Sequence, residues 1–303
     1  MAITSENPLK IAERRFLKLQ VSGLSFHPYL MSSQCDALAR LFRDDDPETV
    51  GLVKEQLVIK GESVLPDLRD LVNADSAIVA AHAQEVLHTI AGKKSAADLE
   101  ALLKSGAEFP LEQASWLIAS ALMPWIDLEN VRAVLDGWGR EVLHRLSEGA
   151  TDQVSVLTAY LNGELGMDGN AEDYYNHENS VLPCVIENRK GLPLTLTLLY
   201  IFIGARAGIP VYGVNLPGHF IARCGEIYFD PFHGGRVLSL ADCADILARQ
   251  QIELSDEHLE NPGSREVLAR MLANLAHAYE IEEANWQKRM VDRWLGILTG
   301  AES

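Results

Sequence analysis

A histidine and an aspartate, one hairpin apart, are the residues of this chain whose types could carry chemistry. His219 precedes a short apolar strand segment, and Asp230 ends the next one. A carboxylate that hydrogen-bonds to an imidazole fixes the orientation of the ring and stabilises its protonated form, as an acid–base pair requires. On spacing alone such a pair more often has a structural role, since Asp230 precedes Pro231 and can cap a turn at the strand end.

The hairpin between the two strand segments sets the expected geometry of this pair. Gly225-Glu226 fits a two-residue turn whose register pairs Ile221 with Asp230. Because His219 and Ile221 share one face, Asp230 becomes a diagonal neighbour of His219, about 7–8 Å away along the backbone. Cys224 falls on the opposite face and is a poor nucleophile for this histidine. A turn longer by one residue would reverse both placements.

A proline opens the apolar helix that precedes these strands. Pro193 suits the first helical position, and the leucine and isoleucine side chains that follow predict a buried helix. The N-terminus of such a helix lowers the pKa of a cysteine thiol, but a prolyl ring can neither attack nor donate. Cys184, upstream, is the candidate replacement, and an inert buried thiol is the alternative. Thr195 and Thr197 are expected to bond to carbonyls or cap the helix.

Four further residues are candidates for binding. Asn179, Glu187 and Arg189 are polar residues in the segment that leads to the apolar helix, and Phe220 follows His219. The polar three either shape a cleft or only pin their own segment in place.

The spacing disfavours a metal site. His177, His219, Asp230 and His233 could supply ligands, but no two of them share one element at helical i, i+4 or strand i, i+2 spacing. No pair of cysteines has the C-x-x-C spacing, which argues against structural zinc and against a disulfide framework. The cysteines are Cys35, Cys184, Cys224 and Cys243. The sequence therefore names no metal and no cofactor.

Composition excludes several classes of partner. The chain has 303 residues, 48% of them hydrophobic and 23% charged, with a net charge of −17. An acidic chain without a basic face is not expected to bind nucleic acid or an anionic membrane. The longest uncharged run, 191–205, is shorter than the roughly 20 residues that cross a bilayer. Residues 1–20 lack the apolar region of a secretory signal, so a cytoplasmic protein with reduced thiols is expected.

Helical periodicity divides the chain into three expected domains. Residues 1–149 are expected to be helical, 150–262 to form an α+β core, and 263–303 to form a helical hairpin resembling a tetratricopeptide unit. Within the first domain, a helix from Leu65 and an apolar face from Ile78 to Ile90 resemble a HEAT-type pair. The predicted fold class is thus α+β and predominantly helical.

A series of short motifs in order resembles the SirB-type family of transglutaminase-like proteins. The matching segments are Asn162–Asp173, Tyr174-Tyr175, Asn179-Ser180, Glu187, Arg189–Pro193, Leu216–Phe220, Asp230–Phe232 and Gly234–Arg236. The resemblance extends over about Leu111 to Leu298. It implies a papain-like transglutaminase core with helices on both sides. His219 and Asp230 then correspond to the second and third positions of a Cys–His–Asp triad, and Pro193 stands at the first. The resemblance supplies no activity.

Three hypotheses follow. The favoured one is a transglutaminase-fold pseudoenzyme without a nucleophile, which binds a protein or peptide partner. The alternative is an amide hydrolase or acyl-transferase that uses His219 and Asp230 with either Cys184 or an activated water. A structural helical adaptor with an inert core is the third, and the sequence does not separate it from the first.

Overall fold

The computed structural model describes residues 33–106, 108–149 and 152–301, so the segment considered above as a secretory signal lies outside the described residues. The chain divides into two compact units. Among the described residues, the first comprises those up to Ser95 with Met123–Ile126, and the second comprises Ala96–Leu122 and those from Asp127 on. This division differs from the expected boundaries at 149 and 262.

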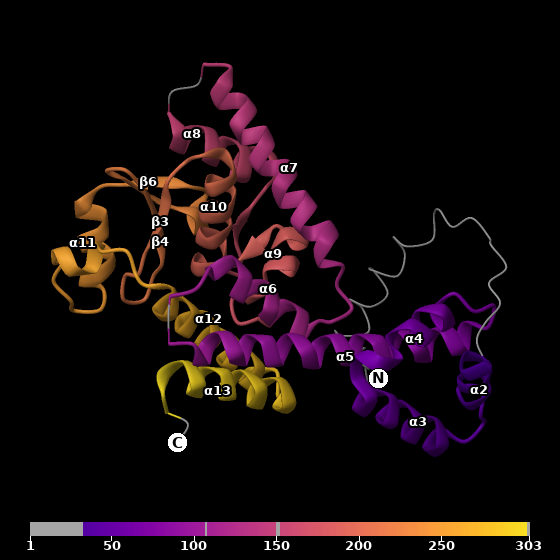
Figure 1. Ribbon diagram of the computed structural model, residues 1–303. Helices are drawn as coiled ribbons and strands as arrows, with labels where there is room; N and C mark the ends of the chain where they lie inside the picture. Colours follow the sequence, from indigo (N-terminus) through magenta and orange to yellow (C-terminus); the bar gives the residue numbers. More distant parts are fainter. Residues whose placement is uncertain (1–32, 107, 150–151, 302–303) are drawn as a thin grey trace, which may run out of the picture. The chain divides into compact units, whose positions relative to one another are not determined.

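The first unit is helical (Figure 1). Its elements are α2 (Ser33–Leu41), α3 (Pro47–Lys60), the 3₁₀ turn η2 (Gly61–Val64), α4 (Leu65–Val72) and the first part of α5 (Ala77–Lys104). Asp46 caps α3 and accepts hydrogen bonds from the backbone N–H groups of Glu48 and Thr49. Ile78 is a correction to the expected apolar face, because 54% of it is exposed. Position 78 is rotated by about 100° from its buried neighbour Val79.

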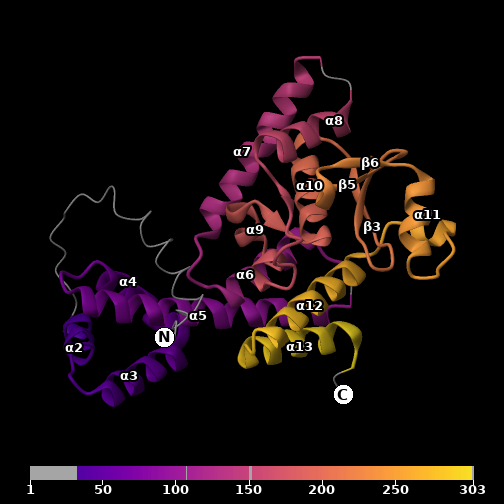
Figure 2. The same ribbon diagram turned by 180° about the vertical axis from the view of Figure 1, so that it is seen from behind.

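The second unit holds the predicted chemistry and consists of helices around two small sheets (Figure 2). Before the apolar helix come α6 (Leu111–Leu122), α7 (Leu128–Ser147), α8 (Gln153–Thr158), the π-helical η3 (Ala159–Glu164), η4 (His177–Ser180) and α9 (Leu182–Asn188). The helices from Pro193 on are α10 (Pro193–Ala207), η5 (Pro231–His233), α11 (Leu240–Ala248), η6 (Asp256–Leu259), α12 (Ser264–Ile281) and α13 (Asn285–Thr299). Helix α7 packs on α10 and α6 packs on α12, which explains why these flanks and the core form one unit.

The larger sheet is antiparallel, with strand order β3-β4-β5-β6. The strands are β3 (Val211–Val214), β4 (Ile221–Cys224), β5 (Ile227–Asp230) and β6 (Arg236–Leu238). The predicted two-residue turn is confirmed, because Cys224 pairs with Ile227. A second, parallel pair joins β1 (Asp168–Gly169) to β2 (Lys190–Gly191).

The two faces of the larger sheet are covered by different helices. Phe229 on one face contacts Tyr200 of α10, with ring centroids 5.4 Å apart. On the other face Val214, Ile221 and Leu238 form a buried cluster with residues of α11. Since side chains alternate along a strand, Asp230 belongs to the face covered by α11. The carboxyl end of β5 thus delivers Asp230 to the edge of that layer.

The apolar helix begins at the predicted residue. Pro193 occupies the first turn of α10, and every residue from Pro193 to Tyr200 is buried. Helix α10 ends at Ala207 and is capped by Gly208, whose positive φ of 72° suits glycine at a helix terminus. In the part of the chain that the structure describes, no helix is both long and apolar enough to span a membrane.

Candidate functional site

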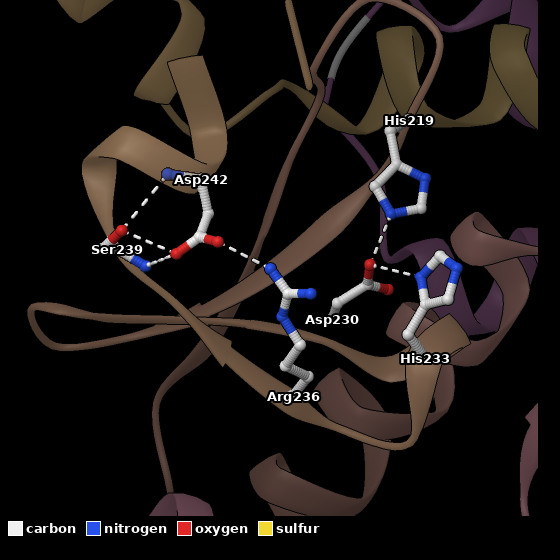
Figure 3. A network of polar contacts seen from close by, with 6 residues as sticks. All are labelled: His219, Asp230, His233, Arg236, Ser239 and Asp242. Atoms are coloured by element: carbon white, nitrogen blue, oxygen red, sulfur yellow. Dashed lines mark hydrogen bonds and ion pairs between the residues drawn. The ribbon is translucent and has the colours of Figure 1, made fainter. Parts of the chain in front are cut away.

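The predicted His–Asp pair is formed, and a second histidine joins it. The Nε2 atom of His219 lies 2.7 Å from Oδ2 of Asp230, and Nδ1 of His233 lies 2.7 Å from the same oxygen (Figure 3). His219 lies in the loop two residues before β4, which begins at Ile221. Two imidazoles therefore converge on one carboxylate oxygen.

The Asp230 carboxylate is buried, and both of its oxygens accept hydrogen bonds. Its side chain is 6% exposed, and its second oxygen accepts a hydrogen bond of 3.0 Å from the backbone N–H of Phe232. Burial by itself raises the pKa of Asp230, but the hydrogen bonds and charges of His219 and His233 outweigh it, so the pKa is lowered. The group is therefore an orienting anion rather than a proton donor at neutral pH.

His233 is the residue of this cluster that spacing rules for helices and strands miss. Pro231 starts the 3₁₀ turn η5 directly after β5, and this turn brings His233 back beside Asp230. The next residue, Gly234, has φ of 68°, and the Gly235 N–H donates to the Asp230 carbonyl at 2.8 Å. An aspartate followed by proline and by a histidine at i+3 is the signal that could have identified the cluster.

The cluster opens into a cavity of about 290 Å³ on the α11 side of the sheet. Arg236 and Arg249 line it together with both histidines of the cluster. Arg236 donates to Asp242 at 2.6 Å, while Arg249 has no ion-pair partner among the described residues. None of the residues that line this cavity is Cys, Ser or Thr.

The N-terminus of α10 is closed by its own residues. The Thr195 hydroxyl donates to the Asn179 carbonyl at 2.6 Å and accepts from the Leu192 N–H at 3.0 Å, as the capping prediction requires. Thr197 is fully buried, and its hydroxyl has no hydrogen-bond partner among the described residues. Pro193 is buried and does not line the cavity.

The candidate nucleophile Cys184 lies on α9 and is not among the residues that line the cavity. Burial, and then the negative charges of Glu178 and Glu187, raise the pKa of its thiol. Burial likewise raises the pKa of Cys224 and of Cys243. Cys224 lies on the face opposite to that of Asp230, and its thiol contacts Gln153. These surroundings oppose the thiolate that nucleophilic attack needs.

We expect iodoacetamide at neutral pH to label the cysteines of the folded chain slowly. All four thiols are buried, and burial raises the pKa of three of them. We therefore expect each cysteine to be alkylated at least roughly 10-fold more slowly than in the urea-denatured chain. A mass-spectrometric time course of each cysteine-containing peptide measures the rates. Rapid labelling confined to Cys184 would contradict this expectation and support the cysteine-dependent alternative.

Among the binding candidates, Asn179 pins its own segment. It is 3% exposed, accepts from the side chain of Asn170 at 2.9 Å and donates to the carbonyls of Asp173 and Tyr174. The backbone carbonyl of Asn179 also accepts the hydrogen bond from the Thr195 hydroxyl. The side-chain groups of Asn179 are therefore used within the protein, while Glu187 is exposed at the end of α9.

The other two binding candidates lie in packed surroundings. Arg189 ends α9 with φ of 60°, and its guanidinium lies 4.5 Å from the ring centroid of Trp138. One of its terminal nitrogens is buried without a hydrogen-bond partner among the described residues, and burial lowers its pKa. Phe220 has no exposed surface and packs under the guanidinium of Arg270. Neither Arg189 nor Phe220 lines the cavity.

Comparison with protein families assigns the region that contains this site. Residues 129–273 match the model of the transglutaminase-like superfamily. The match includes α10, the four-stranded sheet and the His219–Asp230–His233 cluster. No solved structure matches the chain.

Curated relatives come from bacteria and from animals. A UPF0162 protein of Xylella fastidiosa strain Temecula1 is 34% identical over 161 residues, which cover 48% of this chain and 56% of the relative. A UPF0162 protein of Vibrio cholerae is 27% identical over 168 residues, covering 53% of this chain and 61% of that protein. The human F-box only protein 21 is 32% identical over 134 residues, covering 40% of this chain and 21% of that protein. Each match thus spans less than two thirds of the relative. The chain therefore carries a transglutaminase-like domain over residues 129–273 and is similar to bacterial UPF0162 proteins.

Proposed function

We propose that the transglutaminase-like domain is a binding module without covalent catalysis, and that its cavity takes a carboxylate-bearing segment of a peptide or protein partner. The observation that carries this proposal is the lining of the cavity beside His219 and Asp230. It contains two arginines and two histidines but no Cys, Ser or Thr. Pro193 at the start of α10 agrees with the missing nucleophile.

The charges around the cavity favour an anionic ligand. The chain as a whole carries a net charge of −17, yet Arg236 and Arg249 both line this cavity. The one carboxylate in the lining, Asp230, is already engaged by both histidines and by a backbone N–H. Arginine recognises carboxylates through paired N–H donors, so an exposed Arg249 is suited to this role.

The size of the cavity favours a side chain or a chain end. Its volume of about 290 Å³ lies just below the range of small-molecule pockets, which span roughly 300–1,000 Å³. Leu238 and Ile246 supply an apolar wall. A glutamate side chain or a C-terminal residue fits this combination of a small volume, one apolar wall and cationic groups.

The same proposal includes membership of the SirB-type group and the type of helical elements that flank the domain. The ordered motifs around His219 and Asp230 support membership of the SirB-type group. The pairing of α12 with α13 supports a tetratricopeptide-like hairpin, and the helices of the first unit support a HEAT-like pair. A binding module flanked by helical elements agrees with an adaptor function.

Peptide binding to the full chain tests the proposal. The probe is a fluorescein-labelled octapeptide made in four forms, with Glu or Gln at one central position and with a free or an amidated C-terminus. We expect polarisation to rise with the forms that keep a carboxylate, and the two sources of carboxylate are separated by comparing them. Arg249→Ala is expected to weaken binding roughly 10-fold or more, because a charge-assisted hydrogen bond is lost.

Arg289→Ala is the matched control for this measurement. Arg289 is exposed on α13 and does not line the cavity, so its removal changes the net charge equally. Equal affinity for the Glu and Gln forms that both carry an amidated C-terminus, together with no effect of a free C-terminus, would overturn the proposal. So would cleavage or transamidation of the peptide that is lost in His219→Ala.

A further inference from the structure

We propose that His219, Asp230 and His233 form a binding site for one divalent transition-metal ion of the Zn²⁺ type. The ligand atoms would be Nε2 of His219, Oδ2 of Asp230 and Nδ1 of His233. These three atoms lie within 4.8 Å of one another. Two ligands of one zinc ion, each about 2.0–2.2 Å from it, are at most about 4.4 Å apart, so small side-chain rotations suffice.

The donor set selects the class of metal. Two imidazole nitrogens and one carboxylate oxygen suit zinc and the neighbouring transition metals, whereas magnesium and calcium prefer oxygen ligands throughout. Three protein ligands leave a coordination position open, as in catalytic rather than structural zinc sites. This position faces the cavity of about 290 Å³ that the three residues line.

The surroundings hold the three side chains in place. The second oxygen of Asp230 accepts the Phe232 N–H at 3.0 Å, which fixes the carboxylate. The Phe232 ring lies edge-on to both imidazoles, with centroids 6.4 Å from His219 and 5.1 Å from His233. Asp230 ends a strand and His233 belongs to the turn that directly follows it, so the positions of these two ligands are coupled.

The same atoms form a hydrogen-bonded cluster when no ion is bound, and the two states compete. Each imidazole then donates N–H to Asp230, whereas a metal ligand must present its lone pair. A neutral histidine can carry its proton on the other ring nitrogen, so the exchange requires a change of tautomer. Arg236 and Arg249 line the cavity and lower the affinity for a cation, but they favour an anionic oxygen at the open position.

Metal titration of the full chain, without peptide, tests this site. After treatment with a chelator and its removal, we expect calorimetry with ZnCl₂ to give one ion per chain. CoCl₂ is expected to give visible absorption bands of a nitrogen–oxygen site, without a thiolate charge-transfer band, because no cysteine lines the cavity. MgCl₂ in excess is expected not to displace the ion.

Variants locate the ion. His233→Ala and Asp230→Asn are each expected to weaken zinc binding roughly 10-fold or more, as ligand loss does. The control is His144→Ala, because the side chain of His144 is 62% exposed and that of His233 is 63% exposed. Thermal unfolding by circular dichroism establishes that each variant is folded.

Two outcomes would overturn the site: no stoichiometric zinc binding to the native chain, or binding that His233→Ala leaves unchanged. Either result is independent of the proposed peptide function. Peptide binding is measured separately, in the chelator-treated chain, and Arg249→Ala is expected to leave the zinc stoichiometry at one.

Discussion

Replacing Asp230 with Ala is expected to lower the free energy of unfolding of the second unit by about 3 kcal/mol. The change leaves the Phe232 N–H and the His219 imidazole without their acceptor, and each buried donor that loses its partner costs roughly 1–3 kcal/mol. The loss adds to the small cavity left by the side chain. Urea denaturation followed by circular dichroism measures the effect.

Two further variants separate the contributions of the Asp230 hydrogen-bond acceptor, the Asp230 charge and the His233 ring. Asp230→Asn keeps an acceptor oxygen and is expected to cost less than Asp230→Ala. His233→Ala is expected to stay within about 0.5 kcal/mol of the native chain, because the His233 side chain is 63% exposed and water can replace its contacts. An Asp230→Ala variant as stable as the native chain would show that the cluster contributes nothing to the fold.

Local rules predict the parts of the site that depend on neighbours in the sequence. The Gly225-Glu226 turn fixes the register of the hairpin, and the register brings Asp230 to His219. The start of α10 follows from a proline before a continuous apolar run. Both features need only the alternation of strands and the preferences of turns and helix ends.

The rest of the site depends on contacts that sequence patterns do not contain. Arg249 reaches the cavity only because α11 packs on the sheet through Leu238, Cys243 and Leu247. His233 reaches Asp230 through the 3₁₀ turn η5, which has only three residues and is too short to leave a periodic pattern in the sequence. The cationic lining that Arg249 adds to the cavity is therefore not contained in the sequence patterns.

The division of the chain shows the same limit. Periodicity predicts the helices of the flanks, but it carries no information on which core each helix joins. Helix α7 packs on α10 and α12 packs on η4, and both helices fall in the same compact unit as the sheet. Residues 129–273, matched by the transglutaminase-like model, likewise begin in α7 and end in α12.

Gly169→Ala is expected to destabilise the second unit by roughly 1–3 kcal/mol, the usual cost of forcing extra volume into a packed site. A Cβ atom at position 169 would lie 2.5 Å from the Phe232 carbonyl oxygen and 2.6 Å from an atom of its ring. The backbone of η5 must therefore move. Phe232 lies between Asp230 and His233 in the sequence, so its movement displaces these proposed zinc ligands. We therefore also expect Gly169→Ala to weaken zinc binding by roughly 10-fold or more.

Gly163→Ala is the matched control, since an added Cβ there meets no heavy atom within 4 Å and its backbone needs no positive φ. We expect its stability to stay within about 0.5 kcal/mol of that of the native chain, or to rise slightly because alanine restricts the unfolded state. Urea denaturation and zinc calorimetry on both variants compare the two positions. Equal stability for the two variants would show that η5 moves to make room for the new methyl group. The close packing of β1 on η5 would then not be the cause of the position of His233.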